Sequence, residues 1–351
     1  MIASSLLLVT YGLIILYSLD ANTGEGLVTF YKQLIFFVVG IGLFSMMVSM
    51  HYIHFSSYNW YVYILGVLLL ILVIAFGVEI RGVRGWFVIG PVSIQPVEFV
   101  KVLMILFFAQ FFAQYHQFMN QWRYIGVSIG LIAPLLLLLF IQPDLGSAFI
   151  VGVIWATMLF FTKIQRKQLA LLAGVMLVLA VIGWQFMADY QKARLTTFLD
   201  PERDPLGQGY NINQALTAVG SGELFGRGLG LGPQSQLSFL PENRTDFIFS
   251  VIAEELGFVG AVVLILLYAV LLYRMLRIAR RIREPFGFYV VIGVMAFVTI
   301  QTYMNIAMNI SLFPVTGIPL PLVSQGGSSL WSVLIALGLV QSIYIRYQRA
   351  T

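Results

Sequence analysis

The sequence predicts an all-α polytopic membrane protein with about ten transmembrane helices and one long extracellular loop between spans seven and eight. Three observations lead to this fold class. Of the 351 residues, 60% are hydrophobic and only 10% are charged, whereas roughly a quarter of a soluble domain is charged. Apolar runs close to the ~20 residues that cross a bilayer recur along the chain. Basic residues gather in alternate connections, as in multi-pass proteins.

The apolar runs define ten expected spans. The first, at residues 2–19, has neither a basic leader nor a small-residue cleavage site, so we expect a retained helix rather than a signal peptide. The other nine are expected at residues 31–50, 59–79, 96–115, 125–142, 146–162, 168–188, 247–273, 287–312 and 328–345. Together they form one predicted transmembrane domain over residues 1–351.

The charged residues in the connections predict which way the helices run. With a cytoplasmic N-terminus, the inner segments hold eleven of the twenty basic residues but only Glu284 of the fifteen acidic ones. An excess of Lys and Arg marks cytoplasmic loops, so we expect both termini in the cytoplasm. The net charge of +5 is then a topology signal and does not indicate nucleic-acid binding. The absence of cysteine and the presence of only three histidines argue against disulfides and zinc chemistry.

The connection at residues 189–245 is far longer than the others and is expected outside the cell. Its Leu, Phe and Tyr content favours an ordered loop, with a short helix near Asn211 to Val219. The glycine run at residues 220–232 fits no dinucleotide-binding pattern, and no strand-helix-strand context surrounds it. We interpret this run as a flexible segment that exposes its backbone.

Ionisable side chains within or beside spanning helices are costly unless they are paired or hydrated, so each marks a candidate site. Glu98 and Lys101 share one face of span four, where they either pair with each other or answer a charge on another helix. Asp144, between spans five and six, either caps the next helix or lines a site. The stretches that contain these residues are the first two of four polar stretches that mark candidate sites.

The other two polar stretches precede spans eight and ten. Residues 240–257 place Arg244 and Asp246 at the mouth of span eight, and Glu254 and Glu255 about two helical turns inside it. Residues 314–329 contain three prolines and paired glycines, which fit either a broken, re-entrant segment or a simple turn. All four stretches lie on the outer side of the predicted topology. We therefore expect one polar cavity that opens to the outside and is roofed by the long loop.

At these residues the sequence resembles the SEDS family of cell shape, elongation, division and sporulation proteins. The resemblance runs from about residue 80 to residue 330 and rests on RGxxxWxxxGPxxxQPxExxK, QPDLG, FLDPERDPLGQGYNINQ, GSGELFGRGLGLGPQSQLSFLPENRTDFIF and PLPLVSQGGSS. The stretches FLDPERDPLG, QSQLSFLPE and GIPLPLVS resemble the rod-shape subfamily, RodA, more than the division subfamily, FtsW. Two stretches depart from the family. SQGG at 324–327 stands for the usual SYGG, and RGW at 84–86 stands for RRW.

The resemblance implies a peptidoglycan glycosyltransferase in the bacterial cytoplasmic membrane. Such an enzyme polymerises lipid II, a disaccharide pentapeptide on undecaprenyl pyrophosphate, at the outer face and works with a class B penicillin-binding protein. The family's essential aspartate falls on Asp246, and its conserved Glu and Lys of span four fall on Glu98 and Lys101. The two departures put in doubt any role that the missing Tyr or second Arg carries.

The reaction itself indicates which groups are needed. An inverting displacement of a lipid pyrophosphate by a sugar hydroxyl needs a carboxylate to accept the proton and positive charge near the leaving group. We expect Asp246 to be the general base, with Glu254 and Glu255 lining or bracing the cavity. The expected substrate-binding residues are Glu98, Lys101, Arg81, Trp86, Asp144, Arg244 and Ser324. Arg227 is a further candidate cation, and a divalent ion, Mg²⁺ or Mn²⁺, is an expected aid.

Two other classes of protein would use an outward cavity. A lipid II flippase must also open inward, so it should carry polar residues in the cytoplasmic half of its spans or inverted repeats, and neither appears. A scaffold for a cross-linking enzyme does not need buried charges at one depth, although scaffolding can accompany catalysis. A division or sporulation role within the same family also stays open.

Overall fold

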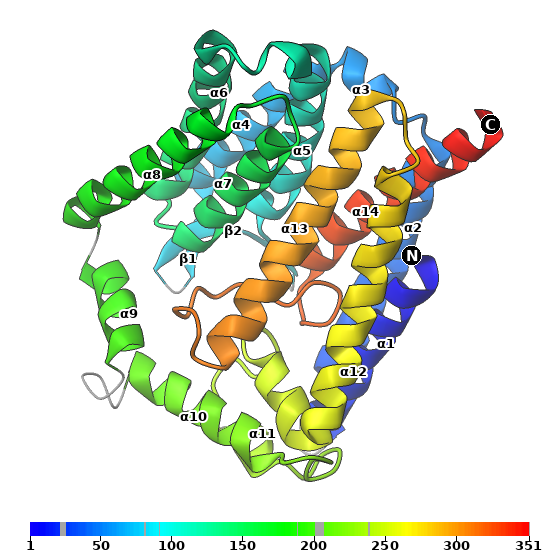
Figure 1. The fold of residues 1–351 in the computed structure, drawn as a ribbon. Helices are drawn as coiled ribbons and strands as arrows, with labels where there is room; N and C mark the ends of the chain where they lie inside the picture. Colours follow the sequence, from blue (N-terminus) through cyan, green and yellow to red (C-terminus); the bar gives the residue numbers. More distant parts are fainter. Residues whose placement is uncertain are drawn as a thin grey trace. The chain divides into compact units, whose positions relative to one another are not determined.

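The computed structural model describes residues 1–21, 26–80, 82–90, 92–187, 189–200, 207–237 and 239–350. Arg81, one of the expected substrate-binding residues, lies outside these ranges. Ten helices correspond in order to the ten expected spans (Figure 1). They are α1 (Ile2–Ala21), α2 (Val28–Ser49), α4 (Asn59–Phe76), α5 (Pro96–Tyr115), α6 (Trp122–Ile141), α7 (Leu145–Phe160), α8 (Arg166–Phe186), α12 (Ile248–Ala279), α13 (Pro285–Asn309) and α14 (Gly327–Ala350).

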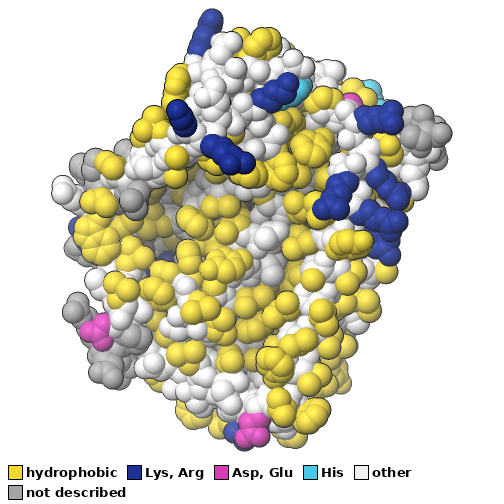
Figure 2. All heavy atoms as spheres, in the orientation of Figure 1, with side chains coloured by type: hydrophobic (Ala, Val, Ile, Leu, Met, Phe, Trp, Pro, Cys, Tyr) yellow, Lys and Arg dark blue, Asp and Glu magenta, His cyan; other side chains and the backbone are white. Residues whose placement is uncertain are grey.

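Most of these helices can cross a bilayer by length and composition alone. Within the described ranges, eight are both long and apolar enough, and α7 is a shorter apolar helix. In Figure 2, apolar side chains cover much of the visible face, and Lys and Arg side chains gather at the end of α12. A surface rich in apolar side chains, with charges at the helix ends, is what a bilayer selects. The predicted helical multi-pass fold is therefore confirmed.

Shorter elements occupy the connections between the long helices. They are α3 (His54–Ser57), the 3₁₀ helix η1 (His116–Phe118), α9 (Asp189–Leu199), α10 (Gln208–Ser221) and α11 (Pro233–Gln236). The position of α10 confirms the short helix predicted near residues 211–219. The loop before α12 is thus an ordered run of three short helices joined by turns in the part that the structure describes.

A small antiparallel sheet joins α4 to α5 and was not predicted. Its strands are β1 (Val78–Ile80), β2 (Val83–Ile89) and β3 (Val92–Ile94), in the order β1-β2-β3. Val78 pairs with Trp86, and Phe87 pairs with Ile94. The run of valine, tryptophan, phenylalanine and isoleucine in β2 is typical of a strand. Trp86 is half-buried in this sheet.

Contacts within the chain divide it into two compact units. Unit 1 comprises Met1–Met46, Arg194–Ile278 and Val298–Gly338, and unit 2 comprises Met47–Ala193, Ala279–Phe297 and Leu339–Thr351. Each unit draws on separate segments from all along the chain. The division therefore does not test the single domain predicted over residues 1–351, which stays a prediction.

Each unit has a core of its own. In unit 1, α1 and α12 lie side by side (Figure 1), and the Tyr11 hydroxyl donates to the carbonyl of Gly260 at 3.0 Å. In unit 2, α5 is almost entirely buried, with Ile105, Phe108 and Phe112 at its centre. The burial of α5 matters for the site because this helix carries Glu98 and Lys101.

Candidate functional site

Asp246 lies directly before α12 in unit 1 and is only 6% exposed. Its main-chain carbonyl accepts two hydrogen bonds from α13, one from Asn305 Nδ2 at 2.9 Å and one from Asn309 Nδ2 at 3.0 Å. Its Oδ2 atom faces Gly317, where an added β-carbon would stand 3.6 Å away. Gly317 also has a φ of +73°, which side chains other than glycine rarely adopt. The aspartate is therefore held at a defined place by its main chain.

The two asparagines connect three segments of unit 1. Asn309 Oδ1 accepts from the main-chain N–H of Ser250 at 3.0 Å and from its hydroxyl at 2.7 Å. Asn305 Nδ2 also donates to the carbonyl of Ile318 at 2.8 Å. Both asparagines are fully buried. Buried amides that make several hydrogen bonds fix the segments they join, because breaking any one bond leaves a costly unpaired group.

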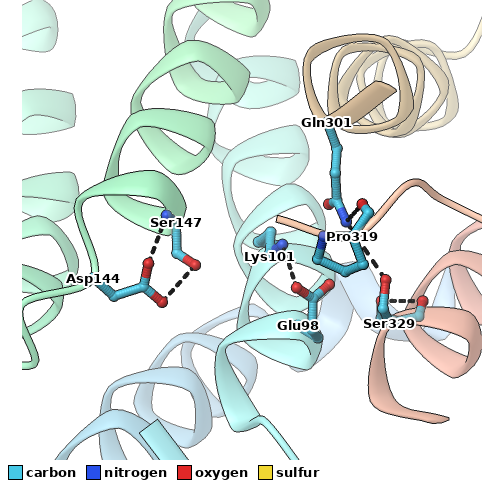
Figure 3. A network of polar contacts seen from close by, with 8 residues as sticks. Glu98, Lys101, Asp144, Ser147, Gln301, Pro319 and Ser329 are labelled. Carbon is cyan, nitrogen blue, oxygen red and sulfur yellow. Dashed lines mark hydrogen bonds and ion pairs between the residues drawn. The ribbon is translucent and has the colours of Figure 1, made fainter. Parts of the chain in front are cut away.

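Gln301 extends this polar face of α13 by one more turn. Its Nε2 atom donates to the carbonyl of Pro319 at 3.1 Å and lies 3.5 Å from Ser329 Oγ (Figure 3). The segment at residues 310–326 that these amides hold is irregular, and its centre around Leu322 is buried. The segment is therefore a long irregular connection and not a simple turn, and its re-entry into the membrane stays a prediction.

The residues just before Asp246 are held in the same way. The main-chain carbonyl of Arg244 accepts from the N–H of Gln325 at 2.9 Å. The carbonyl of Thr245 accepts from the Ser324 hydroxyl at 2.5 Å. Consecutive carbonyls from Arg244 to Asp246 thus all bind groups of α13 or of the irregular segment. We call these hydrogen bonds to the main chain of residues 244–246 the cradle of Asp246. The cradle brings three predicted site residues together: Arg244, Asp246 and Ser324.

The side chain of Arg244, a residue of the cradle, forms an ion pair. Arg244 pairs with Asp20, at the end of α1, with 2.9 Å between Nη2 and Oδ1. The Asp20 side chain is 2% exposed and that of Arg244 is 28% exposed. Asp20 Oδ2 also accepts from the N–H of Phe30 at 2.9 Å. Asp20 was not among the predicted site residues, although an acidic residue at the end of an apolar run is a signal that could have identified it.

Glu254 and Glu255 are fully buried and brace the long loop. The two oxygens of Glu254 accept the N–H groups of Gln234, at 2.8 Å, and Ser235, at 3.0 Å, in the first turn of α11. Glu255 accepts the Ser18 hydroxyl at 2.7 Å and Gln236 Nε2 at 2.8 Å. Bracing is one of the two roles expected for these residues.

Unit 2 contains the other predicted charges. Lys101 Nζ lies 2.7 Å from Glu98 Oε1 on the same helix (Figure 3), and both side chains are at most 3% exposed. The Lys101 ammonium also lies 5.1 Å from the centre of the Phe297 ring, within the range of a cation–π contact. The internal pair is the first of the two interpretations left open for these residues.

Asp144 caps α7 in unit 2, as one of its two interpretations predicted. Its Oδ1 atom accepts the N–H of Ser147 at 2.9 Å, and its Oδ2 atom accepts the Ser147 hydroxyl at 2.7 Å (Figure 3). Capping by aspartate satisfies a main-chain donor that the first helical turn leaves unpaired. Both oxygens of Asp144 are therefore used in the local structure.

Comparisons with known proteins place the chain in a family. Residues 1–349 match the cell cycle protein family of FtsW, RodA and SpoVE. The chain belongs to this family. Stage V sporulation protein E of Bacillus subtilis strain 168 is 36% identical over 355 residues, which cover 98% of this chain and 96% of that protein. The peptidoglycan glycosyltransferase MrdB of Escherichia coli strain K12 is 40% identical over 285 residues, covering 81% and 77% respectively.

A solved structure supports the same assignment. One chain of a peptidoglycan synthase complex, in which polymerization and crosslinking are coordinated, superposes with a TM-score of 0.84 and 30% identity. The superposition covers 99% of this chain and 97% of the other. The resemblance to the SEDS family, which is this FtsW/RodA/SpoVE family, is therefore confirmed.

Within this FtsW/RodA/SpoVE chain, the predicted site residues fall into two groups. Arg244, Asp246 and Ser324 meet in the cradle of unit 1, and Glu98 and Lys101 form a pair in unit 2. The common cavity that would join the two groups stays a prediction, as do the substrate-binding roles of Trp86 and Asp144. The amides of Gln301, Asn305 and Asn309 were missed, although their spacing of four residues along an apolar span indicates a polar stripe.

A cavity of about 430 Å³ lies in the long loop of this family member, between Ser221 and Pro233. Glu223 and Arg227 are among its lining residues. In the part of the chain that the structure describes, no three His, Asp or Glu side chains group closely enough to hold a metal ion.

Proposed function

We propose that this chain is a peptidoglycan glycosyltransferase that polymerises lipid II during cell elongation and shape maintenance. The observation that carries the proposal is the main-chain cradle of Asp246, which holds a buried carboxylate at the entrance of a spanning helix. A reactive group held by rigid helices loses little entropy when its substrate binds. The glycosyltransferase MrdB, a relative that is 40% identical, supports the activity.

In the proposed reaction Asp246 is the general base. Its carboxylate accepts the proton of the acceptor sugar hydroxyl while that oxygen attacks the anomeric carbon of the donor. The bond from this carbon to the pyrophosphate oxygen breaks, the lipid pyrophosphate leaves with the electron pair, and the new glycosidic bond has the inverted configuration. Asp246 then releases its proton to water. The position of Asp246 at a helix entrance suits a substrate whose sugar lies outside the bilayer and whose tail lies within it.

Positive charge for the leaving pyrophosphate is proposed to come from arginine. Arg244 is the nearest candidate in sequence, and its pairing with Asp20 orients the guanidinium group while 28% of the side chain stays exposed. Arg227 lines the loop cavity and is the second candidate. A Mg²⁺ or Mn²⁺ ion is proposed to arrive with the substrate, because Mg²⁺ commonly binds through substrate phosphates and few protein carboxylates.

We propose that the protein lies in the bacterial cytoplasmic membrane with both termini in the cytoplasm and Asp246 near the outer face. The arginines at the end of α12 support this orientation, because Lys and Arg gather on cytoplasmic ends. We also propose a class B penicillin-binding protein as the partner. The similarity to a chain of a complex that coordinates polymerization and crosslinking supports a partner of this kind.

A sporulation role is the second candidate, with the same chemistry. The match to stage V sporulation protein E over 98% of the chain favours it. The alternative of a lipid II flippase receives no comparable support, because the polar groups of unit 1 concentrate at the entrance of α12. Complementation of cells that lack either the elongation or the sporulation relative separates the two roles.

The decisive experiment is a polymerisation assay with purified chain and lipid II, in which product length is measured on a gel. The assay is run with and without the cross-linking partner, so that an enzyme that needs its partner is also detected. Glycan polymer is the expected product in at least one of the two conditions. The absence of polymer in both, together with transfer of lipid II across vesicle membranes, would overturn the proposal in favour of a flippase.

Orientation is tested by cysteine labelling, for which the absence of native cysteine provides a clean background. Ser221→Cys should react with an impermeant maleimide in intact cells, and Arg281→Cys should react only after the cells are opened. The opposite pattern would place Asp246 near the cytoplasm and contradict the proposed topology.

A further inference from the structure

Helix α12 is broken at Gly257, where φ is 68° and ψ is −166°. A break of this kind leaves N–H and C=O groups without partners inside the helix. In a spanning helix such groups cost several kcal/mol each unless protein supplies new partners, because lipid offers none. The break therefore requires a neighbour that can pair with its main chain.

The glycine-rich loop after α10 is that neighbour. Its N–H groups donate to α12 carbonyls on one side of the break, and its carbonyls accept α12 N–H groups on the other side. The hydrogen bonds are Arg227 N to Glu254 O at 3.0 Å, Gly228 N to Glu255 O at 3.0 Å, Phe258 N to Glu223 O at 2.9 Å and Val259 N to Leu224 O at 3.1 Å. The loop thus completes the main-chain hydrogen bonding of a spanning helix.

Glycine is needed here because the two backbones approach so closely. A β-carbon on Gly226 would stand 2.2 Å from the carbonyl oxygen of Glu255, and one on Gly222 would stand 1.8 Å from that of Ala253. A β-carbon on Gly257 would likewise stand 2.2 Å from the nitrogen of Gly226. The interpretation of this glycine run as a flexible, backbone-exposing segment is therefore wrong. The run is packed against α12.

Large apolar side chains beside this close contact are exposed. Leu224 is 61% exposed and Phe225 is 81% exposed, and the neighbouring α12 residues Phe258 and Val259 are 62% and 47% exposed. Main-chain hydrogen bonds from Phe258 to Glu223 and from Val259 to Leu224 hold the two segments next to each other, and we call these four exposed residues the loop patch. Large apolar patches that are not covered by protein mark an interaction surface.

The length of α12 places the loop patch within the bilayer. From Phe258 to Arg274 the helix rises by roughly 24 Å at about 1.5 Å per residue. The hydrocarbon core is about 30 Å thick, and Arg274 begins the basic cluster that marks one of its boundaries. Phe258 then lies roughly 6 Å inside the opposite boundary, and less deep if the helix is upright in a thinner membrane. The loop patch also continues the exposed apolar side of α12, which includes Val263.

We propose that residues 222–231 form a loop that dips into the membrane, with Leu224 and Phe225 in contact with lipid acyl chains. Acyl chains are the expected neighbours of the loop patch because the patch continues the exposed apolar side of α12. In addition, the main-chain groups at the break already have hydrogen-bond partners within the protein. The loop carries Glu223 and Arg227 at its base, where charged side chains reach the headgroup region. It also anchors the long loop beside Glu254 and Glu255, which brace the segment that leads to Asp246. The inference depends on the membrane position of α12 and not on the proposed reaction.

The test measures the depth of single labelled cysteines in lipid nanodiscs. Phe225→Cys carries a fluorophore whose quenching is compared for lipids with a quencher on the acyl chain and for iodide in water. Val263→Cys, on the exposed side of α12, is the control for lipid, and Thr217→Cys, exposed on α10, is the control for water. We expect acyl-chain quenching at Phe225 to match that at Val263 and to exceed that at Thr217 several-fold. Leu224→Cys should behave in the same way.

Two outcomes would overturn the proposal. Iodide quenching at Phe225 equal to that at Thr217 would mean that the loop patch faces water. Weak quenching by both agents would mean that protein covers the patch, for example a second copy of the chain. Each labelled variant is first checked for an unchanged unfolding temperature, so that a local distortion is not mistaken for a change in depth.

Discussion

The candidate site residues of the two units differ in how far along the chain their partners described above lie. In unit 2, Glu98 pairs with Lys101, and Asp144 binds Ser147, so each of these partners is three residues away. Other buried groups of unit 2 do have remote partners, since Gln142 donates to the carbonyl of Leu70 and Ser342 donates to that of Met50. In unit 1 the partners are remote. Their pairs are Asp20 with Arg244, Ser18 with Glu255, Gln33 with Ser324, and Asp246 with Asn305 and Asn309.

This difference indicates different roles. A pair within one helix satisfies its own charges and constrains little beyond that helix. A network between remote segments holds those segments in one arrangement, which is the condition for placing a reactive carboxylate within hydrogen-bond reach of a substrate. Asp144 and Asp246 both stand at the start of a helix, but Asp144 uses its carboxylate oxygens to cap the helix, whereas α13 holds the main chain of Asp246.

The largest expected effect separates these two aspartates. Asp246→Asn keeps the shape of the side chain and removes its basicity, so the rate of lipid II polymerisation should fall by roughly 10²- to 10⁴-fold. Thermal unfolding should be nearly unchanged. Asp144→Asn is the matched control and should keep most activity, because asparagine also caps helices. Equal activity of the two variants would remove the distinction between the two units.

The second prediction concerns whether Glu98 and Lys101 have any role beyond pairing with each other. Lys101→Met leaves the Glu98 carboxylate buried beside an apolar side chain, which should lower the free energy of unfolding by about 3–5 kcal/mol. The double change Glu98→Gln and Lys101→Met should recover most of this loss, as measured by thermal unfolding in detergent. We expect recovered folding without recovered polymerisation. Full activity of the double variant would make the pair purely structural.

The third effect tests the remote contact between the glycine loop and α12. Gly226→Ala introduces a β-carbon 2.2 Å from a main-chain oxygen at a φ of +79°, and strain with overpacking should destabilise unit 1 by about 2–4 kcal/mol. Gly220→Ala is the control. It has no atom within 4 Å of the added carbon and lies in α10, where alanine is favoured over glycine by about 1 kcal/mol. Similar unfolding temperatures for both variants would contradict the packed loop.

The smallest effect concerns the amides of α13. Asn309→Leu removes one of the two donors to the Asp246 carbonyl and leaves both donors of Ser250 without this acceptor, which should cost about 1–3 kcal/mol of stability. The rate of polymerisation at saturating lipid II should fall as well, because Asp246 is less well placed. Ser128→Ala, which removes a hydrogen bond to Ile125 three residues away in unit 2, should lower stability slightly and leave the rate unchanged. A normal rate in Asn309→Leu would show that positioning does not depend on this amide.

The sequence predicted features that arise within short stretches. The spans followed from apolar runs, because each helix satisfies its own main chain and needs only length and hydrophobicity to cross a bilayer. The cap at Asp144 was one of two interpretations of an aspartate before a predicted span, and the pair of Glu98 and Lys101 was one of two interpretations of their spacing. The strands β1 to β3 were not predicted, although the composition of β2 is typical of a strand, because such short strands leave no long periodic pattern in the sequence.

The amino-acid sequence by itself determined the multi-pass helical fold, the family and the choice of Asp246 as the candidate base. Only the tertiary structure revealed what holds Asp246, because its partners Asn305 and Asn309 lie about 60 residues away on another helix. The same is true of the loop at Gly226 and the break at Gly257. Their contact consists of main-chain hydrogen bonds. Every residue has a carbonyl acceptor and every residue except proline has an N–H donor, so the pattern of side chains does not indicate which two segments meet.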